Sequence, residues 1–390
     1  MKKINIAIVA ACPFPAQRGT PVRIFRTAEA LGRRGHNVHV VAYHFGDASS
    51  TDAFQIHRIP DIKSYRNFNP GPTYPKLLVL DPLLAIKLFQ VLKTHQIDLI
   101  HAHHYEGLLV SLTVKSMTGH PVIYDAHTTL ESELPSYPMS LPDTPKQVIG
   151  RFLDQWAPKQ ADRIIAVDDD IKNFLIRFSK VNPSGITVVP NGIEPRTFMK
   201  IQNVRKLSGD GIKRVIYTGN FGEFQGIDLL LKSFHEIVKQ QDNVRLCMVS
   251  MFPFDRFDPM ARELGIRHKI DFIQTGFDQV PGLLAKADVA VNPRVVCDGF
   301  PQKNFNYMAA GKPVVAFAGS AKLIEHGKTG WVVENGNVDE FAKGIIRLLQ
   351  DRKLADRLGS NARQLVMTEF TWEKAAEKIE AVYQRVLNRW

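Results

Sequence analysis

The stretch Asp298-Gly-Phe-Pro-Gln-Lys-Asn-Phe-Asn-Tyr-Met-Ala-Ala-Gly-Lys-Pro-Val-Val315 passes from a polar loop through a short apolar helix pattern into a buried strand. Gly311 and Pro313 separate the helix from the strand, because neither residue readily continues a helix. A helix that begins behind such a loop presents unpaired backbone N–H groups and the positive end of its dipole. The stretch therefore predicts a strand–loop–helix–strand unit of an α/β sheet, whose helix start suits a phosphate or a polyhydroxylated ligand.

The composition is that of a folded globular protein with two domains. Of its 390 residues, 44% are hydrophobic and 23% are charged, and a chain of this length exceeds one ordinary core. Its three cysteines lack paired or metal-like spacing, which suits a reducing compartment. No stretch reaches the roughly 18 uninterrupted apolar residues of a membrane span, and the apolar N-terminus is better interpreted as a strand than as a signal peptide. We therefore expect a cytoplasmic protein.

The net charge of +11 is compatible with nucleic acid, an anionic membrane or an anionic substrate. Nucleic acid is not expected, because the sequence has no basic motif interleaved with aromatic residues and no recognition helix. Segment 76–92 is apolar, punctuated by lysines and preceded by aromatic residues. It is either a core helix, which we favour, or a helix on a bilayer surface. A phosphorylated donor and an anionic membrane surface together account for the charge.

Strand and helix patterns alternate through both halves of the chain. Apolar strand patterns in the first half lie at residues 4–11, 38–42, 97–101, 121–125, 163–167 and 187–192. Those in the second half lie at residues 213–219, 244–249, 270–273, 289–292 and 314–317. A polar stretch at 194–212 separates the halves and is expected to be a linker. This order predicts two parallel α/β domains, and the absence of Gly-x-Gly-x-x-Gly argues against a dinucleotide-binding enzyme.

Polar side chains follow several of the predicted strands, at the sheet edge where ligands of open α/β sheets bind. They are His101, His103 and His104; Asp125 and His127; and Asp168 to Asp170. The three neighbouring histidines alternate in direction at a strand end and have no carboxylate or cysteine close in sequence, so a metal site is not expected there. The three aspartates are better interpreted as a helix cap than as catalytic groups.

Short motifs recur in a specific order along nearly the whole chain. They are Arg34-Gly-His-Asn-Val38, Asp98-Leu-Ile-His-Ala-His103, Val189-Pro-Asn-Gly192, Tyr217-Thr-Gly219, Ala287-Asp-Val-Ala-Val-Asn-Pro293, Tyr307-Met-Ala-Ala-Gly-Lys-Pro-Val-Val315 and Phe370-Thr-Trp372. Through these motifs the chain resembles the retaining glycosyltransferases of family 4. The resemblance implies the GT-B fold, with an acceptor-side domain at 1–195, a nucleotide-sugar domain at 196–371, a cleft between them, and a C-terminal helix at 372–390 packed back on the first domain.

The resemblance further implies transfer of a hexose from a UDP- or GDP-linked donor to an acceptor hydroxyl, with the anomeric configuration retained. The expected acceptor is a sugar or a lipid-linked molecule of envelope glycolipid or polysaccharide synthesis, at the inner face of the membrane. No cofactor and no metal are expected, because helix N-termini and Arg or Lys stabilise the leaving diphosphate. No residue stands out as a general base, which fits a front-face mechanism in which the departing phosphate takes the acceptor proton.

Two departures from the family pattern concern the donor site. The family signature of two glutamates becomes Asp298 and Asn306, so a carboxylate is kept toward the hexose and an amide replaces the acid toward the ribose. The Arg and Lys that grip the diphosphate are replaced by Asn220 and Gln225. Arg294 and Lys303 flank the signature loop, and we expect them to supply the missing charge. Surface charge is the alternative for both.

The resemblance also assigns further residues. His127 is expected to reach the donor sugar, or else to be an ordinary strand-end histidine, and Gly19 is expected beside the donor phosphate, or else to be a turn glycine. His103 and Asp125 are expected on the acceptor side. The other residues expected to bind the donor are Gly219, Gly226, Gly299, Phe300, Asn304 and Phe305.

Two alternatives to an active transferase remain at this stage. One is a catalytically weakened GT-B protein that binds a nucleotide sugar or a partner without turnover, which the amides at 220, 225 and 306 would favour. The other is a sugar-nucleotide epimerase of the same fold. An epimerase is expected to need acidic and basic groups around the sugar, and the motifs do not favour it.

Overall fold

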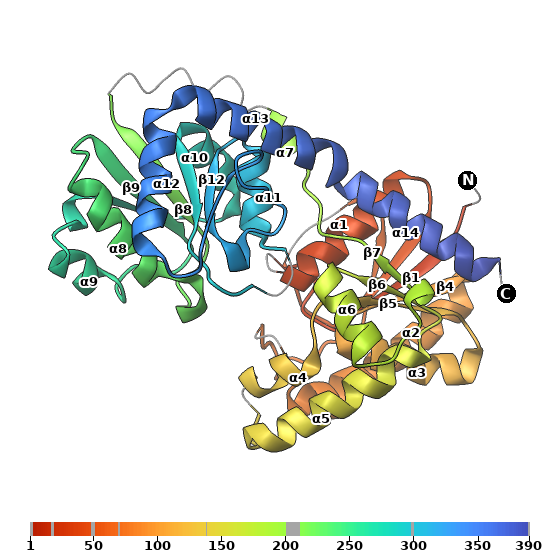
Figure 1. Ribbon diagram of the computed structural model, residues 1–390. Coiled ribbons are helices and arrows are strands. Elements are labelled where there is room, and N and C mark those ends of the chain that lie inside the picture. The colour runs from red at the N-terminus through yellow and green to blue at the C-terminus, as the bar shows by residue number, and fades with distance from the viewer. Residues whose placement is uncertain are drawn as a thin grey trace. The chain divides into compact units, whose positions relative to one another are not determined.

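The computed structural model describes residues 3–16, 19–47, 51–68, 71–137, 139–199, 211–297 and 300–388. The chain forms two compact units, Met1–Asn191 together with Trp372–Trp390, and Gly192–Thr371. Each unit is a parallel β-sheet with helices packed on both faces (Figure 1). The two parallel α/β domains that the sequence predicts are therefore confirmed. The sequence-based division falls after residues 195 and 371.

The first unit is built on a seven-stranded sheet with the order β3-β2-β1-β4-β5-β6-β7. Its strands are β1 (Asn5–Ala10), β2 (Asn37–Ala42), β3 (Gln55–Arg58), β4 (Leu99–His103), β5 (Val122–Ala126), β6 (Arg163–Ala166) and β7 (Ile186–Val188). Apolar residues fill the inner strands because both faces of a parallel sheet are buried. The sequence does not predict β3, since Ile56 is its only apolar residue.

The helices of the first unit cover the two faces of this sheet (Figure 1). They are α1 (Gly19–Arg33), α2 (Asp81–His95), α3 (His104–Thr118), α4 (Leu130–Glu133), α5 (Asp143–Trp156), α6 (Asp169–Arg177) and α14 (Trp372–Leu387). Helices α1 and α14 share one apolar core with the sheet, and α2 and α3 share the other. The Asp168 side chain accepts a hydrogen bond from the Ile171 backbone N–H and begins α6, which confirms the predicted helix cap.

The C-terminal helix α14 contacts the first unit through apolar and charged groups. Ile379 and Tyr383 are buried in the core that α14 shares with α1. The Glu380 carboxylate accepts a hydrogen bond from Arg34 Nε at 2.6 Å and lies 2.9 Å from His36 Nε2. Burial alone raises the pKa of Glu380, but these two partners bring it below its usual value. The Arg-Gly-His motif at 34–36 is thus explained by its contact with the last helix.

Segment 76–92 forms a π-helical turn, Lys76–Leu80, that leads into α2. Its buried side chains include Leu84, Leu88 and Val91, so the segment is a core helix, as the favoured interpretation expects. The first turn also presents an exposed apolar ridge, in which Leu78 is 73% exposed. None of the described helices combines the length and the apolar content that a membrane crossing requires.

The second unit has a six-stranded parallel sheet with the order β10-β9-β8-β11-β12-β13. Its strands are β8 (Lys213–Thr218), β9 (Val244–Ser250), β10 (Ile270–Gln274), β11 (Val289–Asn292), β12 (Val314–Phe317) and β13 (Trp331–Val333). Its helices are α7 (Pro195–Met199), α8 (Ile227–Val238), α9 (Asp258–Glu263), α10 (Val280–Lys286), α11 (Gln302–Ala309), α12 (Val338–Gln350) and α13 (Arg352–Glu369). Helix α7 lies in the stretch that was expected to be a linker, of which residues 200–210 are outside the described part.

The quoted stretch forms the crossover from β11 through α11 to β12, in agreement with the prediction. Gly311 adopts a φ of +67°, which ends α11. The next residue, Lys312, is 1% exposed and donates hydrogen bonds to the carbonyl oxygens of Ala285 at 2.9 Å and Ala287 at 2.6 Å. The Gly-Lys-Pro sequence therefore has a structural role, because it ends one helix and satisfies carbonyls at the end of α10.

Candidate functional site

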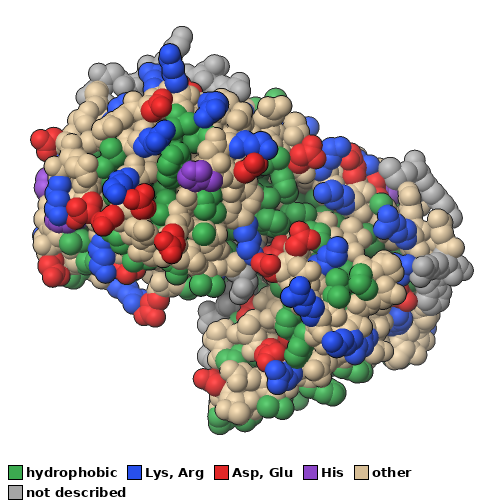
Figure 2. Space-filling model, viewed as in Figure 1, with side chains coloured by type: hydrophobic (Ala, Val, Ile, Leu, Met, Phe, Trp, Pro, Cys, Tyr) green, Lys and Arg blue, Asp and Glu red, His purple; other side chains and the backbone are tan. Residues whose placement is uncertain are grey.

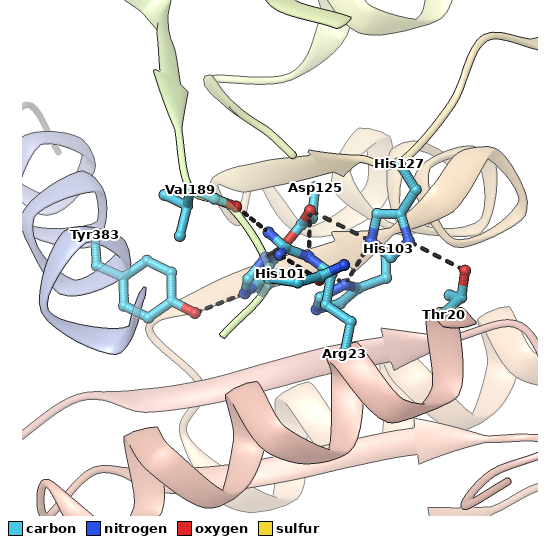
Figure 3. Close-up of polar contacts among 9 residues, drawn as sticks. Thr20, Arg23, His101, His103, Asp125, His127, Val189 and Tyr383 are labelled. Carbon is cyan, nitrogen blue, oxygen red and sulfur yellow. Dashed lines mark hydrogen bonds and ion pairs between the residues drawn. The ribbon is translucent and has the colours of Figure 1, made fainter. Parts of the chain in front are cut away.

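A network of charged and polar side chains surrounds Asp125 at the ends of β4 and β5 (Figure 3). Asp125 is fully buried, and Arg23 of α1 donates to it from Nε at 3.1 Å and from Nη2 at 3.0 Å. Arg23 also donates to the carbonyl oxygen of Val189 at 2.9 Å and to Asn191 Oδ1 at 3.0 Å. These contacts explain the Val-Pro-Asn-Gly motif, which fixes the arginine that holds the carboxylate.

Three histidines complete this network. His103 Nδ1 lies 3.2 Å from His127 Nε2, which is itself 3.3 Å from Asp125 Oδ1. His101 Nδ1 lies 2.7 Å from the Tyr383 hydroxyl of α14. His127 Nδ1 lies 3.1 Å from Thr20 Oγ1, so both of its ring nitrogens have protein partners.

The negative charge of Asp125 is compensated by Arg23 and by the surrounding histidines. Burial alone raises the pKa of Asp125, but Arg23 and the histidines hold it well below its usual value. Burial lowers the pKa of His103 and of His127, so both rings are neutral near pH 7. The network consequently contains one buried carboxylate, one guanidinium and the neutral imidazoles of His103 and His127, which can orient hydroxyl groups.

Ligand atoms of His101, His103 and Asp125 lie within 4.8 Å of one another, a spacing that a metal ion could use. Arg23 already engages both carboxylate oxygens of Asp125, and its positive charge opposes a cation at the same place. We therefore interpret this group as a hydrogen-bonded support. Asp125 is fully buried and does not border the adjoining pocket, and its expected place on the acceptor side stays a prediction.

A pocket of about 220 Å³ adjoins the network within the first unit. Gly19, Thr20 and His103 form one part of its wall. A Cβ atom added at Gly19 would meet no atom within 4 Å, so the glycine leaves open space for a ligand. The other part of the wall is charged, with Lys76 and His104 as the cations and two glutamates as the anions.

His104 joins these glutamates into one charged group. Its Nδ1 is hydrogen-bonded to Glu106, and its Nε2 lies 3.3 Å from Glu133 Oε2. Burial alone lowers the pKa of His104, but the two carboxylates raise it to about 10, so the ring is charged at neutral pH. His104 also has a φ of +62°, a strained conformation for a residue other than glycine, of the kind that clusters at functional sites. The pocket wall thus offers donors and acceptors of both signs, which suits a polyhydroxylated molecule.

In the second unit, the loops after β8 and before α11 bring together several predicted donor residues. Lys303 Nζ donates to Gln225 Oε1 at 2.7 Å and to the Tyr217 hydroxyl at 3.0 Å. Gln225 Nε2 donates to Asn220 Oδ1 at 3.1 Å. Gly219 has a φ of +138°, and a Cβ atom there would lie 3.1 Å from Lys303 Nζ. Lys303 therefore stands beside the two amides that replace the expected cations.

Lys303 is a partly buried cation that has no negatively charged partner among the described residues. Burial and the neighbouring Arg294 guanidinium lower its pKa to about 7. Among the described residues, no carboxylate forms an ion pair with it. Arg294 stacks over the exposed ring of Phe224, with 4.8 Å between its guanidinium carbon and the ring centroid. Both basic residues thus lie in one part of the second unit, as the sequence predicts.

Other predicted donor residues occupy different positions. Asn304 is fully buried, accepts a hydrogen bond from Asn292 and donates to the Ser320 carbonyl oxygen at 2.7 Å. Phe305 is fully buried between Phe300 and Phe370. The side chains of Asn304 and Phe305 therefore belong to the core, and the expected contact of these two residues with the donor stays a prediction.

Three further residues predicted to bind the donor, Phe300, Asn306 and Gly226, have different surroundings. Asn306 is 7% exposed on α11, and Phe300 packs partly against the core. Gly226 has a φ of +69°, and a Cβ atom there would lie 2.1 Å from the Pro293 carbonyl oxygen. Gly226 is therefore required for the close approach of two loops. Asp298 and Gly299 lie outside the described residues.

Sequence reasoning missed Thr20, Arg23, Lys76 and the pair of glutamates of the pocket. A signal for Arg23 exists, since its spacing from Thr27 and Leu31 places it on the buried face of α1. An arginine on an apolar helix face needs a buried anion, and Asp125 is that anion. The pocket glutamates carry no such signal, because helices α3 and α4 bring them together from separate parts of the chain.

Two family models match successive parts of the chain. Residues 18–197 match the model described as Glycosyltransferase Family 4, and residues 200–365 match the model described as Glycosyl transferases group 1. The N-acetyl-alpha-D-glucosaminyl L-malate synthase of Bacillus anthracis is 26% identical over 399 residues, which cover 99% of this chain and 98% of that protein.

Solved structures of glycosyltransferases show the same fold. Sucrose-phosphate synthase from Thermosynechococcus elongatus superposes with a TM-score of 0.80 at 19% identity, over 100% of both chains. HepE of Anabaena in complex with UDP-glucose superposes with a TM-score of 0.71 at 17% identity, over 98% of this chain and 100% of that one. Family models, a full-length relative and the fold agree, and the chain therefore belongs to the group 1 glycosyltransferases of the GT-B fold.

Proposed function

We propose that this glycosyltransferase moves a hexose from a UDP- or GDP-linked donor to an acceptor hydroxyl and retains the anomeric configuration. The observation that carries the proposal is the position of Lys303, whose ammonium group is held by Tyr217 and Gln225 at the loop after β8. A leaving diphosphate develops concentrated negative charge, which a positioned cation stabilises. The complex of HepE with UDP-glucose supports a nucleoside diphosphate donor for this fold.

Arg294 and Lys303 would then replace a divalent metal in stabilising the departing diphosphate. Binding of the anion would favour the charged form of Lys303, whose pKa burial has lowered to about 7. The start of α11 would contribute backbone N–H groups to the same anion. No metal and no cofactor are needed for the transfer in this proposal.

Retention is supported by the ion pairs of the carboxylates at the pocket and in the network beside it. Glu106 and Glu133 are both engaged by His104, and Asp125 is engaged by Arg23. Paired carboxylates are poor general bases, because their partners stabilise the charged form. The departing phosphate would therefore take the acceptor proton, on the same face of the sugar.

We propose that the acceptor is a sugar or a lipid-linked molecule at the inner face of the membrane, and that it enters the pocket of the first unit. Its hydroxyl groups would bond to the charged wall formed by Lys76, His104 and the two glutamates. Helix α5 exposes Val148, Ile149, Phe152 and Trp156, and Figure 2 shows apolar side chains along the same edge of this unit. Such a surface supports contact with lipid and a role in envelope glycolipid or polysaccharide synthesis.

A second candidate is binding of a nucleotide sugar without turnover. It is favoured by the hydrogen bond between Asn220 and Gln225, since two amides occupy places where the family carries cations. The two candidates share the donor and differ only in the chemical step.

A panel of UDP- and GDP-linked sugars tests both candidates. Binding would be measured by calorimetry, and hydrolysis or transfer by release of the nucleoside diphosphate. We expect one donor to bind and to be turned over, and NMR of the product to show retention. Binding without release in the presence of candidate acceptors would favour the second candidate. No binding by any donor would contradict the proposal.

A further inference from the structure

A cluster of three histidines lies on the face of the first sheet opposite to the Asp125 network. His39 is on β2, His57 is on β3, and His95 is the last residue of α2. On β2, Val41 shares its face with His39 and packs in the core formed with α2 and α3. The network around Asp125 instead contacts α14 on the other face. The cluster is thus separate from the proposed acceptor pocket.

The three imidazoles converge closely. One ligand nitrogen from each ring can be chosen so that all three lie within 4.8 Å of one another. His39 Nδ1 is 3.0 Å from His57 Nε2, and the ring centroid of His95 is 4.3 Å from that of His39. Zinc–nitrogen bonds of about 2.0–2.1 Å in tetrahedral geometry place two ligand nitrogens about 3.3 Å apart. Small side-chain rotations would therefore bring the three nitrogens onto one ion.

Apart from the hydrogen bond between His39 and His57, no described polar partner holds the three rings together. No described carboxylate is paired with these histidines, and the ring nitrogens of His95 form no hydrogen bond with another described residue. Lys87 opposes a cation near His57, whereas the C-terminal end of α2 favours one.

We propose that His39, His57 and His95 bind one divalent transition-metal ion, with Zn²⁺ as the expected ion and water as its fourth ligand. Imidazole ligands suit zinc, copper and nickel, and three protein ligands leave one position open. The ion ties the edge strand β3 and its neighbour β2 to the end of α2, so its role is to stabilise the edge of the sheet. This inference does not depend on the donor or on the acceptor of the transfer reaction.

The test is metal binding to the intact chain, purified without a polyhistidine tag and freed of metal with a chelator. Zn²⁺ is titrated by calorimetry, and Co²⁺ is titrated by its visible absorption, which reports tetrahedral coordination. The variants are His57→Gln and His95→Gln, whose rings are only partly buried. The matched control is His268→Gln, an exposed histidine of the second unit. Circular dichroism and the metal-free Tm establish that each variant is folded.

We expect one Zn²⁺ per chain and a higher Tm for the wild type and the control. The His57→Gln and His95→Gln variants should bind Zn²⁺ at least about tenfold more weakly and lose the Co²⁺ absorption. Absence of Zn²⁺ binding to the wild type would show a histidine cluster without a metal function and would overturn the proposal. Unchanged affinity in both variants would place the ion elsewhere and would also overturn it.

Discussion

The polar clusters of the two units differ in how their charges are compensated. In the first unit, Asp125 is fully buried and is met by Arg23 and by histidines. In the second unit, Lys303 rests on a phenol and an amide, and no described carboxylate pairs with it. The fold depends on both partners of a compensated buried pair, because removal of one leaves the other charge buried alone, whereas an uncompensated cation is available to an anion from outside. We therefore interpret the first cluster as a support, and we propose the second as a binding group.

The difference between the two clusters predicts that the largest loss of stability follows from a substitution of Asp125. Asp125→Asn leaves the Arg23 guanidinium buried without a counter-charge, which should lower the free energy of unfolding by about 3–5 kcal/mol. Urea denaturation measures this loss. Asp169→Asn is the matched control, since Asp169 is exposed at the start of α6 and its replacement should cost less than about 1 kcal/mol. Similar losses in the two variants would remove the distinction between the clusters.

Substitution of Lys303 should lower the activity and leave the stability of the fold nearly unchanged. Lys303→Ala removes the cation from the diphosphate site and should lower kcat/KM for the donor about 10²–10³-fold. Its Tm should change little, because no ion pair within the described chain is broken. Lys232→Ala, at an exposed position of α8, should retain full activity. A folded Lys303→Ala variant with normal turnover would exclude the assigned role.

The loop after β8, which carries Gln225, should depend on the close approach of its backbone to the loop at Pro293. In Gly226→Ala, the new Cβ atom meets the Pro293 carbonyl oxygen, and φ is +69°. Gly265 also has a φ of +69°, but a Cβ atom there meets nothing within 4 Å. Gly265→Ala should therefore cost only the strain of the left-handed conformation, about 1–2 kcal/mol, and Gly226→Ala should cost more. Thermal unfolding of the pair checks this, and equal losses would show that the approach of the two loops is not tight.

The smallest expected effect concerns Thr20, which connects the support to the pocket. Thr20→Val keeps the volume and removes the hydroxyl next to His127 Nδ1. The loss of one hydrogen bond is worth about 0.5–1.5 kcal/mol, so transfer should slow by about tenfold or less. Steady-state kinetics with a fixed donor concentration would measure it. A complete loss of activity would mean that the hydroxyl takes part in the reaction itself.

The sequence was sufficient to predict the two α/β domains, because the patterns that mark strands and helix ends are local in the chain. Buried strands such as 289–292 and 314–317 are short apolar runs, and Gly311 and Pro313 mark the end of α11. Strand β3 was missed because it lies at a sheet edge and has a single apolar residue, and β13 was missed because it is only three residues long. Because β3 was not predicted, the sequence analysis also did not place His57 beside His39, and the histidine cluster was missed.

The candidate site was harder to predict because its partners are distant in the chain. Strand ends correctly located Asp125 and His127, but Arg23 reaches Asp125 from a helix 102 positions earlier. In the second unit, the sequence placed Lys303 beside Gln225 through the family pattern. It could not show that the neighbouring Asn304 turns into the core, since that depends on its hydrogen bonds with Asn292 and Ser320.

The pH dependence of nucleoside diphosphate affinity tests the central claim most directly. Lys303 has a pKa of about 7 in the free protein, so it is charged below that pH and neutral above it. Calorimetry with UDP and GDP should show that affinity for the preferred nucleotide falls as pH rises above 7, by about tenfold per pH unit. Lys303→Arg, which stays charged, should remove this dependence. The same pH dependence in wild type and Lys303→Arg would contradict the assignment of Lys303 to the diphosphate.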